Sequence, residues 1–281
     1  MDQNSKGIIA LFSAYIIWGA MPIYWKAIEA VSSFEILGHR VVWSVVFTSV
    51  LIAFNKNWQI FKKMLRSGKR DLFWLAVGGF LISFNWGLYI WAVNDGRVLE
   101  TSLGYFINPL LSMFLGMIFF KEKLNRIQTL ALALAVLGVS IELAAAGSLP
   151  LVSLGLALSF GLYGVLKKTV RVSPEIALFT ETLTVTPFAM AWLIFLQKEG
   201  ASSFPYDSMT NLMLAGSGIM TSIPLLMFAY GASRVPLTTV GFVQYATPTL
   251  SFAVGLLIFK EDIHINIKVK TLFIWISSLN I

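Results

Sequence analysis

Residues 109–122 read PLLSMFLGMIFFKE, and residues 248–261 read PTLSFAVGLLIFKE. The two stretches agree at seven of fourteen positions, including the first proline, a serine, a glycine and the closing Lys-Glu pair. Shared hydrophobicity alone would not place these residues in one register, so the agreement indicates an internal repeat. Two further pairs follow in the same order: Trp18-Gly19 with Tyr163-Gly164, and Glu35-Ile36 with Glu175-Ile176.

The chain around this repeat has the composition of a membrane protein. Of its 281 residues, 57% are hydrophobic and 12% are charged, with a mean hydropathy of +0.77. In soluble domains about 25% of the residues are charged. A helix crosses the hydrocarbon core with about 20 apolar residues, and lipid offers no partner to an unpaired backbone group. The sequence therefore predicts an all-α integral membrane protein with ten spans, near residues 7–25, 34–54, 72–93, 98–120, 127–145, 149–166, 175–196, 209–230, 237–259 and 263–281.

The repeat and the basic residues predict how these spans are arranged. Residues 1–146 and 147–281 would each hold five spans, and because five is odd the second copy must insert with opposite topology. With the N-terminus in the cytoplasm, fourteen of the 21 lysines and arginines fall on cytoplasmic segments and six on outer ones. That bias is the one the positive-inside rule requires. Inverted repeats of this kind recur in secondary transporters.

Several kinds of site are excluded by residues that the sequence lacks. There is no cysteine, and the two histidines are His39 and His264, so we expect neither a thiolate nor a multi-histidine metal site. No GxxxxGK[ST] loop and no HExxH motif occurs, so we expect no direct drive by ATP, no catalytic metal and no cofactor. The net charge of +7 reflects basic loops beside the lipid bilayer and indicates no nucleic-acid partner.

Ionisable side chains inside spans are costly and therefore informative. Val41–Phe54 is too short to cross, so the second span must include Glu35, His39 and Arg40. Glu35 and His39 lie four residues apart on one helix face. Two interpretations stay open: a charged patch that takes part in gating or proton coupling at the outer mouth of a cavity, or a cluster that anchors the helix end. Glu181, a lone carboxylate in the seventh span, would relay protons or meet a substrate amine, or else bond as a neutral acid to nearby backbone.

Two prolines at matching positions of the repeat, Pro109 and Pro248, lie in the middle of their spans. Each frees the carbonyl four residues back and is expected to kink its helix. Paired breaks of this kind indicate the binding site of a transporter, although a kink that serves packing alone is equally compatible with the sequence. Side chains near the breaks or at mid-depth would bind an amphipathic organic solute or pack in the core: Trp18, Asn85, Trp86, Tyr89, Tyr105, Asn108, Tyr163, Gln244 and Tyr245.

Four stretches resemble RarD-type proteins of the EamA branch of the drug/metabolite transporter superfamily. They are Glu35–Arg40 (EILGHR), Val93–Glu100 (VNDGRVLE), Ser102–Pro109 (SLGYFINP) and Gly241–Tyr245 (GFVQY). The likeness covers nearly the whole chain, to about Trp275. It implies two EamA-like halves and a ten-helix inner-membrane carrier that has both termini in the cytoplasm and exports small metabolites such as amino acids.

The last span departs from the pattern of that family. Lys268 and Lys270 interrupt it, and only Thr271–Ile281 is cleanly apolar. These eleven residues reach roughly 16 Å as a helix, against a core of about 30 Å. The sequence therefore predicts a short or poorly inserted tenth span, which puts the activity of this chain in question.

The function expected from the sequence is a secondary transporter that exports small organic metabolites, such as amino acids or drug-like solutes, across the bacterial inner membrane. Proton coupling through Glu35, His39 or Glu181 is an open hypothesis. A membrane-embedded enzyme with Glu181 or His39 as the acid–base group is a second interpretation, but no paired catalytic constellation supports it. A carrier that has lost transport is a third. The substrate, the coupling ion and the oligomeric state stay open.

Overall fold

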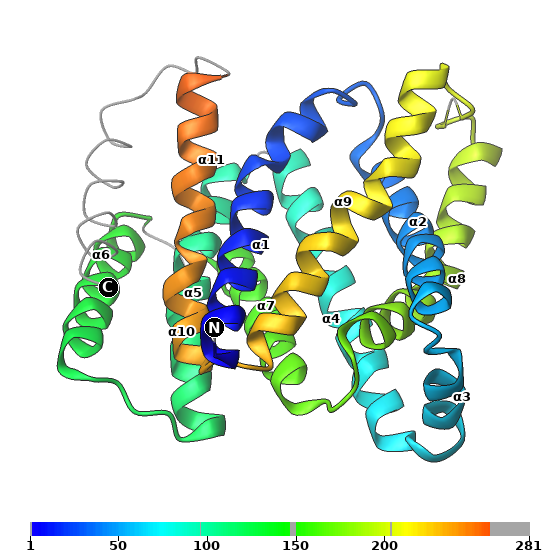
Figure 1. Ribbon diagram of the computed structural model, residues 1–281. Coiled ribbons are helices and arrows are strands. Elements are labelled where there is room, and N and C mark those ends of the chain that lie inside the picture. The colour runs from blue at the N-terminus through cyan, green and yellow to red at the C-terminus, as the bar shows by residue number, and fades with distance from the viewer. Residues whose placement is uncertain (1, 96, 147–149, 203, 259–281) are drawn as a thin grey trace.

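The computed structural model describes residues 2–95, 97–146, 150–202 and 204–258, and every regular element within these ranges is a helix (Figure 1). The helices are α1 (Gln3–Lys26), α2 (Ser33–Phe54), α3 (Trp58–Ser67), α4 (Lys69–Asn94), α5 (Val98–Phe120), α6 (Arg126–Ala146), α7 (Leu151–Thr169), α8 (Pro174–Lys198), α9 (Ser208–Ala232), α10 (Leu237–Gln244) and α11 (Ala246–Leu257). Seven of these helices are long and apolar enough to cross a membrane: α1, α2, α4, α5, α7, α8 and α9.

The helices follow the predicted spans closely over the described residues. The first eight spans each correspond to one helix, and the fourth span, 98–120, has the same bounds as α5. The ninth span differs, because it consists of α10 and α11 with Tyr245 between them. Pro248 has no N–H for the carbonyl of Gln244, so the helical ladder is broken where the two helices meet. In α5 the corresponding Pro109 lies within one continuous helix. The predicted tenth span lies outside the described residues.

One helix, α3, falls in a stretch that the sequence analysis treated as a basic loop. Its ten residues place Phe61 and Met64, both 7% exposed, against the rest of the protein. The Trp58 ring meets the Phe179 ring of α8 edge-on, with centroids 5.5 Å apart. The helix is amphipathic, with its basic side chains on the other face, and it closes the turn between α2 and α4.

Consecutive long helices run in alternating directions, so the connections gather at two ends of the bundle (Figure 1). The N-terminus, α3 and the α5–α6, α7–α8 and α9–α10 connections lie at one end, called here the N-terminal end. The α1–α2 and α8–α9 connections lie at the distal end. Fourteen basic residues belong to the segments at the N-terminal end: Lys6, Lys56, Lys62, Lys63, Arg66, Lys69, Arg70, Lys121, Lys123, Arg126, Lys167, Lys168, Arg171 and Arg234.

The packing of the helices follows a regular pattern. Helix α1 packs on α9, α10 and α11, and α7 packs on α4 and α5. Helix α2 packs on α8 and α9, and α5 packs on α10. Small residues allow the closest contacts: a Cβ atom on Gly218 of α9 would lie 2.3 Å from the carbonyl carbon of Trp43 on α2. The interior between α1, α7 and α9 is filled by apolar and aromatic side chains, among them Tyr15, Tyr163 and Phe228.

Candidate functional site

The guanidinium of Arg40 lies inside the bundle, among side chains from four other helices. Its Cζ atom is 4.9 Å from the ring centroid of Trp25 on α1 and 4.5 Å from that of Trp86 on α4. Its Nε donates a 2.9 Å hydrogen bond to Oγ1 of Thr221 on α9. Tyr105 of α5 is close enough for the two groups to interact electrostatically. Cation–π contacts and one hydrogen bond therefore hold the guanidinium in place.

Tyr105 pairs with Tyr89 of α4, and both tyrosines are partly exposed. The rings of Tyr89 and Tyr105 meet nearly edge-on, with centroids 5.9 Å apart and planes at 66°. Tyr89 is 37% exposed and Tyr105 is 42% exposed. We call the six side chains Trp25, Arg40, Trp86, Tyr89, Tyr105 and Thr221 the Arg40 cluster. The structure thus brings four predicted site residues together and adds Trp25 and Thr221.

An aromatic cluster lies next to the Arg40 cluster, since Trp86 packs against the same core as Trp18. The ring of Trp18 is 5.8 Å from Phe160 and 5.9 Å from Phe228. Phe228 in turn stacks on Tyr163, with centroids 6.0 Å apart and planes at 11°. Trp18 and Tyr163, both predicted site residues, therefore lie in closely packed aromatic contacts. The hydroxyl of Tyr163 donates a hydrogen bond to Glu181 of α8.

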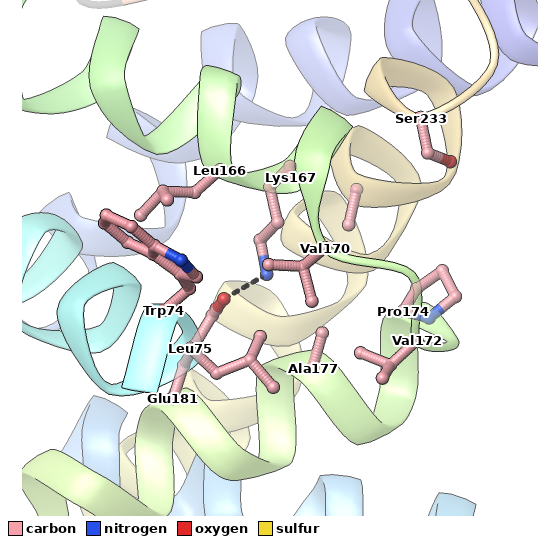
Figure 2. A pocket seen from close by; sticks show the side chains of 11 residues that line it. Trp74, Leu75, Leu166, Lys167, Val170, Val172, Pro174, Ala177, Glu181 and Ser233 are labelled. Atoms are coloured by element: carbon pink, nitrogen blue, oxygen red, sulfur yellow. Dashed lines mark hydrogen bonds and ion pairs between the residues drawn. The ribbon is translucent and has the colours of Figure 1, made fainter. Parts of the chain in front are cut away.

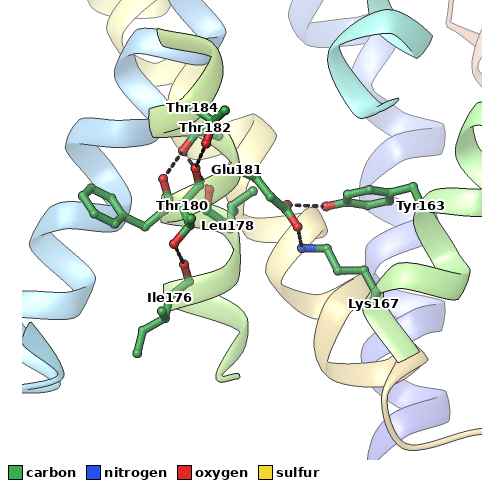
Figure 3. Close-up of polar contacts among 9 residues, drawn as sticks. Tyr163, Lys167, Ile176, Leu178, Thr180, Glu181, Thr182 and Thr184 are labelled. Carbon is green, nitrogen blue, oxygen red and sulfur yellow. Dashed lines mark hydrogen bonds and ion pairs between the residues drawn. The ribbon is translucent and has the colours of Figure 1, made fainter. Parts of the chain in front are cut away.

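Glu181 on α8 is the side chain that the sequence analysis treated as a lone carboxylate. The structure gives it two partners on α7 (Figure 3). Nζ of Lys167 lies 2.5 Å from its Oε1, and the Tyr163 hydroxyl donates a 3.0 Å hydrogen bond to its Oε2. The side chains of Lys167 and Glu181 are 3% and 1% exposed. Glu181 is thus part of a buried ion pair. The position of Lys167, four residues after Tyr163 on one helix face, was the signal in the sequence.

The surroundings of the pair explain how α8 presents Glu181. The hydroxyls of Thr180, Thr182 and Thr184 bond back to carbonyls four residues earlier in α8 (Figure 3), which satisfies them inside the helix. A Cβ atom on Gly79 of α4 would lie 2.5 Å from the carbonyl oxygen of Glu181, so a glycine is required there.

A small cavity of about 20 Å³ lies beside the ion pair, between Trp74, Leu75, Leu166, Val170 and Ala177 (Figure 2). A volume of roughly 10–15 Å³ is enough for one water molecule. The pair is therefore next to a space that a water could occupy.

Glu35 and His39 lie at the distal end and are both buried. Oε1 of Glu35 accepts a 2.6 Å hydrogen bond from the Ser202 hydroxyl, and Oε2 accepts a 2.9 Å bond from the Tyr206 hydroxyl. The ring of His39 lies 5.1 Å from that of Phe204. The α8–α9 connection thus binds to α2 through Glu35, a link that the sequence did not indicate. We call this link the distal carboxylate contact.

A corresponding link exists at the N-terminal end. Glu175, which the predicted repeat pairs with Glu35, accepts a 2.7 Å hydrogen bond from Nδ2 of Asn57 in the α2–α3 connection. We call it the proximal carboxylate contact. At the same end Glu122 accepts hydrogen bonds from the backbone N–H groups of Leu237 and Thr238, at 2.7 and 2.8 Å. It therefore caps the first turn of α10.

The remaining predicted site residues take part in helix contacts. Nδ2 of Asn85 donates to the carbonyl of Leu156 at 2.8 Å and to the Ser159 hydroxyl at 2.9 Å, and so joins α4 to α7. Tyr245 is buried in a core cluster with Met113 and Phe242. Asn108 and Gln244 are buried on the neighbouring helices α5 and α10, and their amide oxygens have no hydrogen-bond partner within the described residues. Pro248 lies in the first turn of α11.

Several long apolar helices, with polar and aromatic side chains gathered between them, define a multi-pass membrane protein. The model of the EamA-like transporter family matches the chain twice, over residues 5–143 and 148–281. The chain belongs to this family, and its relatives make it a RarD-type member.

Two relatives and one solved structure illustrate these similarities. The uncharacterized transporter YojE of Bacillus subtilis is 44% identical over 264 residues, which are 92% of this chain and 87% of that protein. Protein RarD of Escherichia coli is 41% identical over 276 residues, 98% of this chain and 93% of that protein. A solved structure entitled "Crystal structure of protein" superposes with a TM-score of 0.72 at 17% identity, covering 99% of this chain and 98% of that one. At this identity the superposition demonstrates the shared fold alone.

Proposed function

We propose that this protein is a secondary carrier that exports small organic metabolites, such as amino acids or drug-like solutes, across the bacterial inner membrane. The observation that carries the proposal is the Arg40 cluster, in which five helices of a transporter-family protein contribute aromatic and polar side chains to one interior place. Such convergence is typical of a site for an amphipathic small molecule. Because the cluster lies inside the bundle, a solute would reach it from one side of the membrane at a time.

The carrier would consist of two inverted halves, residues 1–146 and 147–281. The packing supports this symmetry, because exchanging α1 with α7 also exchanges their partners: α9 with α4, and α10–α11 with α5. The pairs α2 with α8 and α5 with α10 would then lie on the symmetry axis. Two mirrored halves of this kind expose a central site alternately to the two sides of a membrane.

The two carboxylate contacts are suited to control that alternation. The distal contact joins Glu35 of the first half to the α8–α9 connection of the second. The proximal contact joins Glu175 of the second half to Asn57 of the first. At each end of the bundle a carboxylate of one half is thus bound to a loop of the other. Opening either end requires that its contact be released.

The fourteen basic residues at the N-terminal end support a cytoplasmic location of that end, in accordance with the positive-inside rule. The distal end, with Glu35 and the α8–α9 connection, would then face outward.

Proton coupling would operate through the ion pair of Glu181 and Lys167. A proton accepted by the Glu181 carboxylate removes the charge that holds Lys167, and so loosens the contact between α8 and α7. Protonation and helix movement are linked in this way, because a buried ammonium without a counter-charge is costly. His39, which contacts Phe204 beside the distal contact, is a second group that could respond to protons from outside.

Purified protein in proteoliposomes tests the proposal. We expect solutes from a panel of amino acids and aromatic drugs to accumulate in response to a pH gradient, and to exchange without one. The double variant Lys167→Met, Glu181→Gln should abolish the effect of the gradient and preserve exchange, because it removes the titrating group, leaves no unpaired buried ammonium and keeps an acceptor for Tyr163. No movement of any solute in the panel, or chemical conversion of a solute by protein in detergent, would contradict the carrier.

A further inference from the structure

We infer that Arg40 is the receptor for a carboxylate group of the solute, so that the carrier takes small organic acids with an apolar or aromatic body. The inference rests on the proposed function, since it names the solute class of that same site.

Arg40 has no carboxylate partner among the described residues. The ion pairs there join other groups, including Lys167 with Glu181 and Arg97 with Glu100. Glu35 is on the same helix, but five residues away, which places it roughly 140° around the axis. Both of its oxygens already accept hydrogen bonds. An interior cation without a counter-charge is costly in a membrane, and an anionic solute would remove that cost.

The guanidinium is oriented for such a partner. Trp25 and Trp86 lie near its Cζ atom, and its Nε is occupied by Thr221. Within the described part of the chain, no hydrogen bond of its two terminal nitrogens to another residue is present, whereas Arg97 forms bonds with Glu100 through both Nε and Nη2. A fixed planar fork with open N–H groups matches the two oxygens of a carboxylate.

The depth and the neighbours of Arg40 determine which acids fit. Arg40 comes seven residues after the start of α2, and Tyr105 comes seven residues after the start of α5. Both helices begin at the distal end, so the two side chains lie about 10 Å inward from it. Tyr105 and Tyr89 are partly exposed at that level, and tyrosine rings contact aromatic or apolar bodies favourably. A small acid with such a body would place its carboxylate on Arg40 and its ring on the tyrosines.

The competing explanation is that Arg40 only joins α2 to its neighbours through Trp25, Trp86 and Thr221. The two explanations differ in what substitution does to solutes of different charge. If Arg40 serves packing alone, its substitution would change the binding of all solutes alike. A receptor for carboxylates would affect acids and leave neutral or cationic analogues unchanged.

Three probes with one body and different charge separate these cases: phenylacetate, its neutral analogue phenylacetamide, and the cation phenethylammonium. Their affinities are measured by calorimetric titration of the purified full chain in detergent. We expect Arg40→Gln to weaken phenylacetate binding at least about tenfold, the step expected for a lost charged, bidentate contact. Arg40→Lys should fall between, because it keeps the charge and loses the fork. Arg97→Gln is the matched control, since Arg97 also lies near a tryptophan at the distal end but has Glu100 as its partner, and it should change the affinity less than twofold.

Equal affinity of phenylacetate for the unmodified protein and for both Arg40 variants would overturn the inference, as would the absence of saturable binding. If Arg40→Gln does not fold, Arg40→Lys still decides by the ratio of phenylacetate to phenylacetamide binding. Transport assays in proteoliposomes test this inference and the proposed function separately. Neutral or cationic solutes carried equally well by the unmodified protein and Arg40→Gln would leave the carrier intact and refute the acid receptor. Arg40-dependent binding of phenylacetate without movement of any solute would support the acid receptor and refute the carrier.

Discussion

The buried pair of Lys167 and Glu181 allows a quantitative prediction about stability. Removing one partner of a buried ion pair typically costs about 3–5 kcal/mol, because the other charge stays buried without compensation. Lys167→Met leaves Glu181 with the Tyr163 hydroxyl 3.0 Å from Oε2, and the carboxylate can also take up a proton. We therefore expect the lower figure, about 3 kcal/mol. Glu181→Leu deprives both Lys167 and Tyr163 of their acceptor, so about 4–5 kcal/mol is expected.

The double variant Lys167→Met, Glu181→Leu should be more stable than Glu181→Leu alone, because no unpaired charge remains. The coupling energy from the double-mutant cycle should exceed about 1.5 kcal/mol. Reversible unfolding of the purified protein in mixed detergent micelles measures each value. Lys26→Met is the control: Lys26 and Glu29 form a pair with side chains 60% and 63% exposed, and such a pair contributes at most about 1 kcal/mol. Additive single effects, with a coupling below about 0.5 kcal/mol, would refute the claim that the two side chains act as a pair.

Three further results are expected. A reporter that works only in the cytoplasm should be active when fused after Lys168 and inactive after Gly200, and the reverse pattern would refute the assigned orientation. Because the chain contains no cysteine, a single cysteine that replaces Tyr89 can report access from outside through its reaction with an impermeant maleimide. Glu35→Gln should speed this reaction and Glu175→Gln should slow it. Equal rates in both variants would exclude the carboxylate contacts from the mechanism. Gly79→Ala should lower the free energy of unfolding by about 1–3 kcal/mol through overpacking. Gly87→Ala is the control on the same helix; nothing lies within 4 Å of its added Cβ, so it should be neutral or stabilising. Equal effects of the two substitutions would show that α4 and α8 do not need to approach closely.

The fold followed from the sequence wherever one physical rule decided the outcome. The long apolar runs gave helices with nearly the predicted bounds, and α5 has the bounds expected for 98–120. The short helix α3 was not predicted, because its apolar face consists of a few residues within a basic stretch, Trp58, Phe61 and Met64. Its stability depends on Phe179, more than a hundred residues further along the chain, and a local pattern does not contain such a partner.

The sequence predicted several residues of the candidate site but not the contacts that these residues make. The cost of charge in a membrane identified Arg40 and Glu181. The hydrogen bond of Arg40 to Thr221 joins residues 181 positions apart, and no periodicity indicates it. Lys167 was counted among the basic residues of a loop, because its position close to the end of a span fits that role as well as it fits a buried pair. The hydrogen bonds of Glu35 and Glu175 depend on loops far away in the sequence, which no local pattern contains.

The self-satisfied threonines of α8 have a mechanical consequence. Because these hydroxyls bond within their own helix, the hydrogen bonds that described α8 side chains make to other parts of the chain come from Glu175 and Glu181. Close packing also holds α8, for example where Gly79 of α4 approaches its backbone, because van der Waals contacts contribute to helix association in membranes. Glu175 and Glu181 are the polar links that must break when α8 moves relative to the α2–α3 connection and α7. In the proposed carrier, substitutions at Glu175 and Glu181 should therefore change the rate of transport far more than the affinity for the solute.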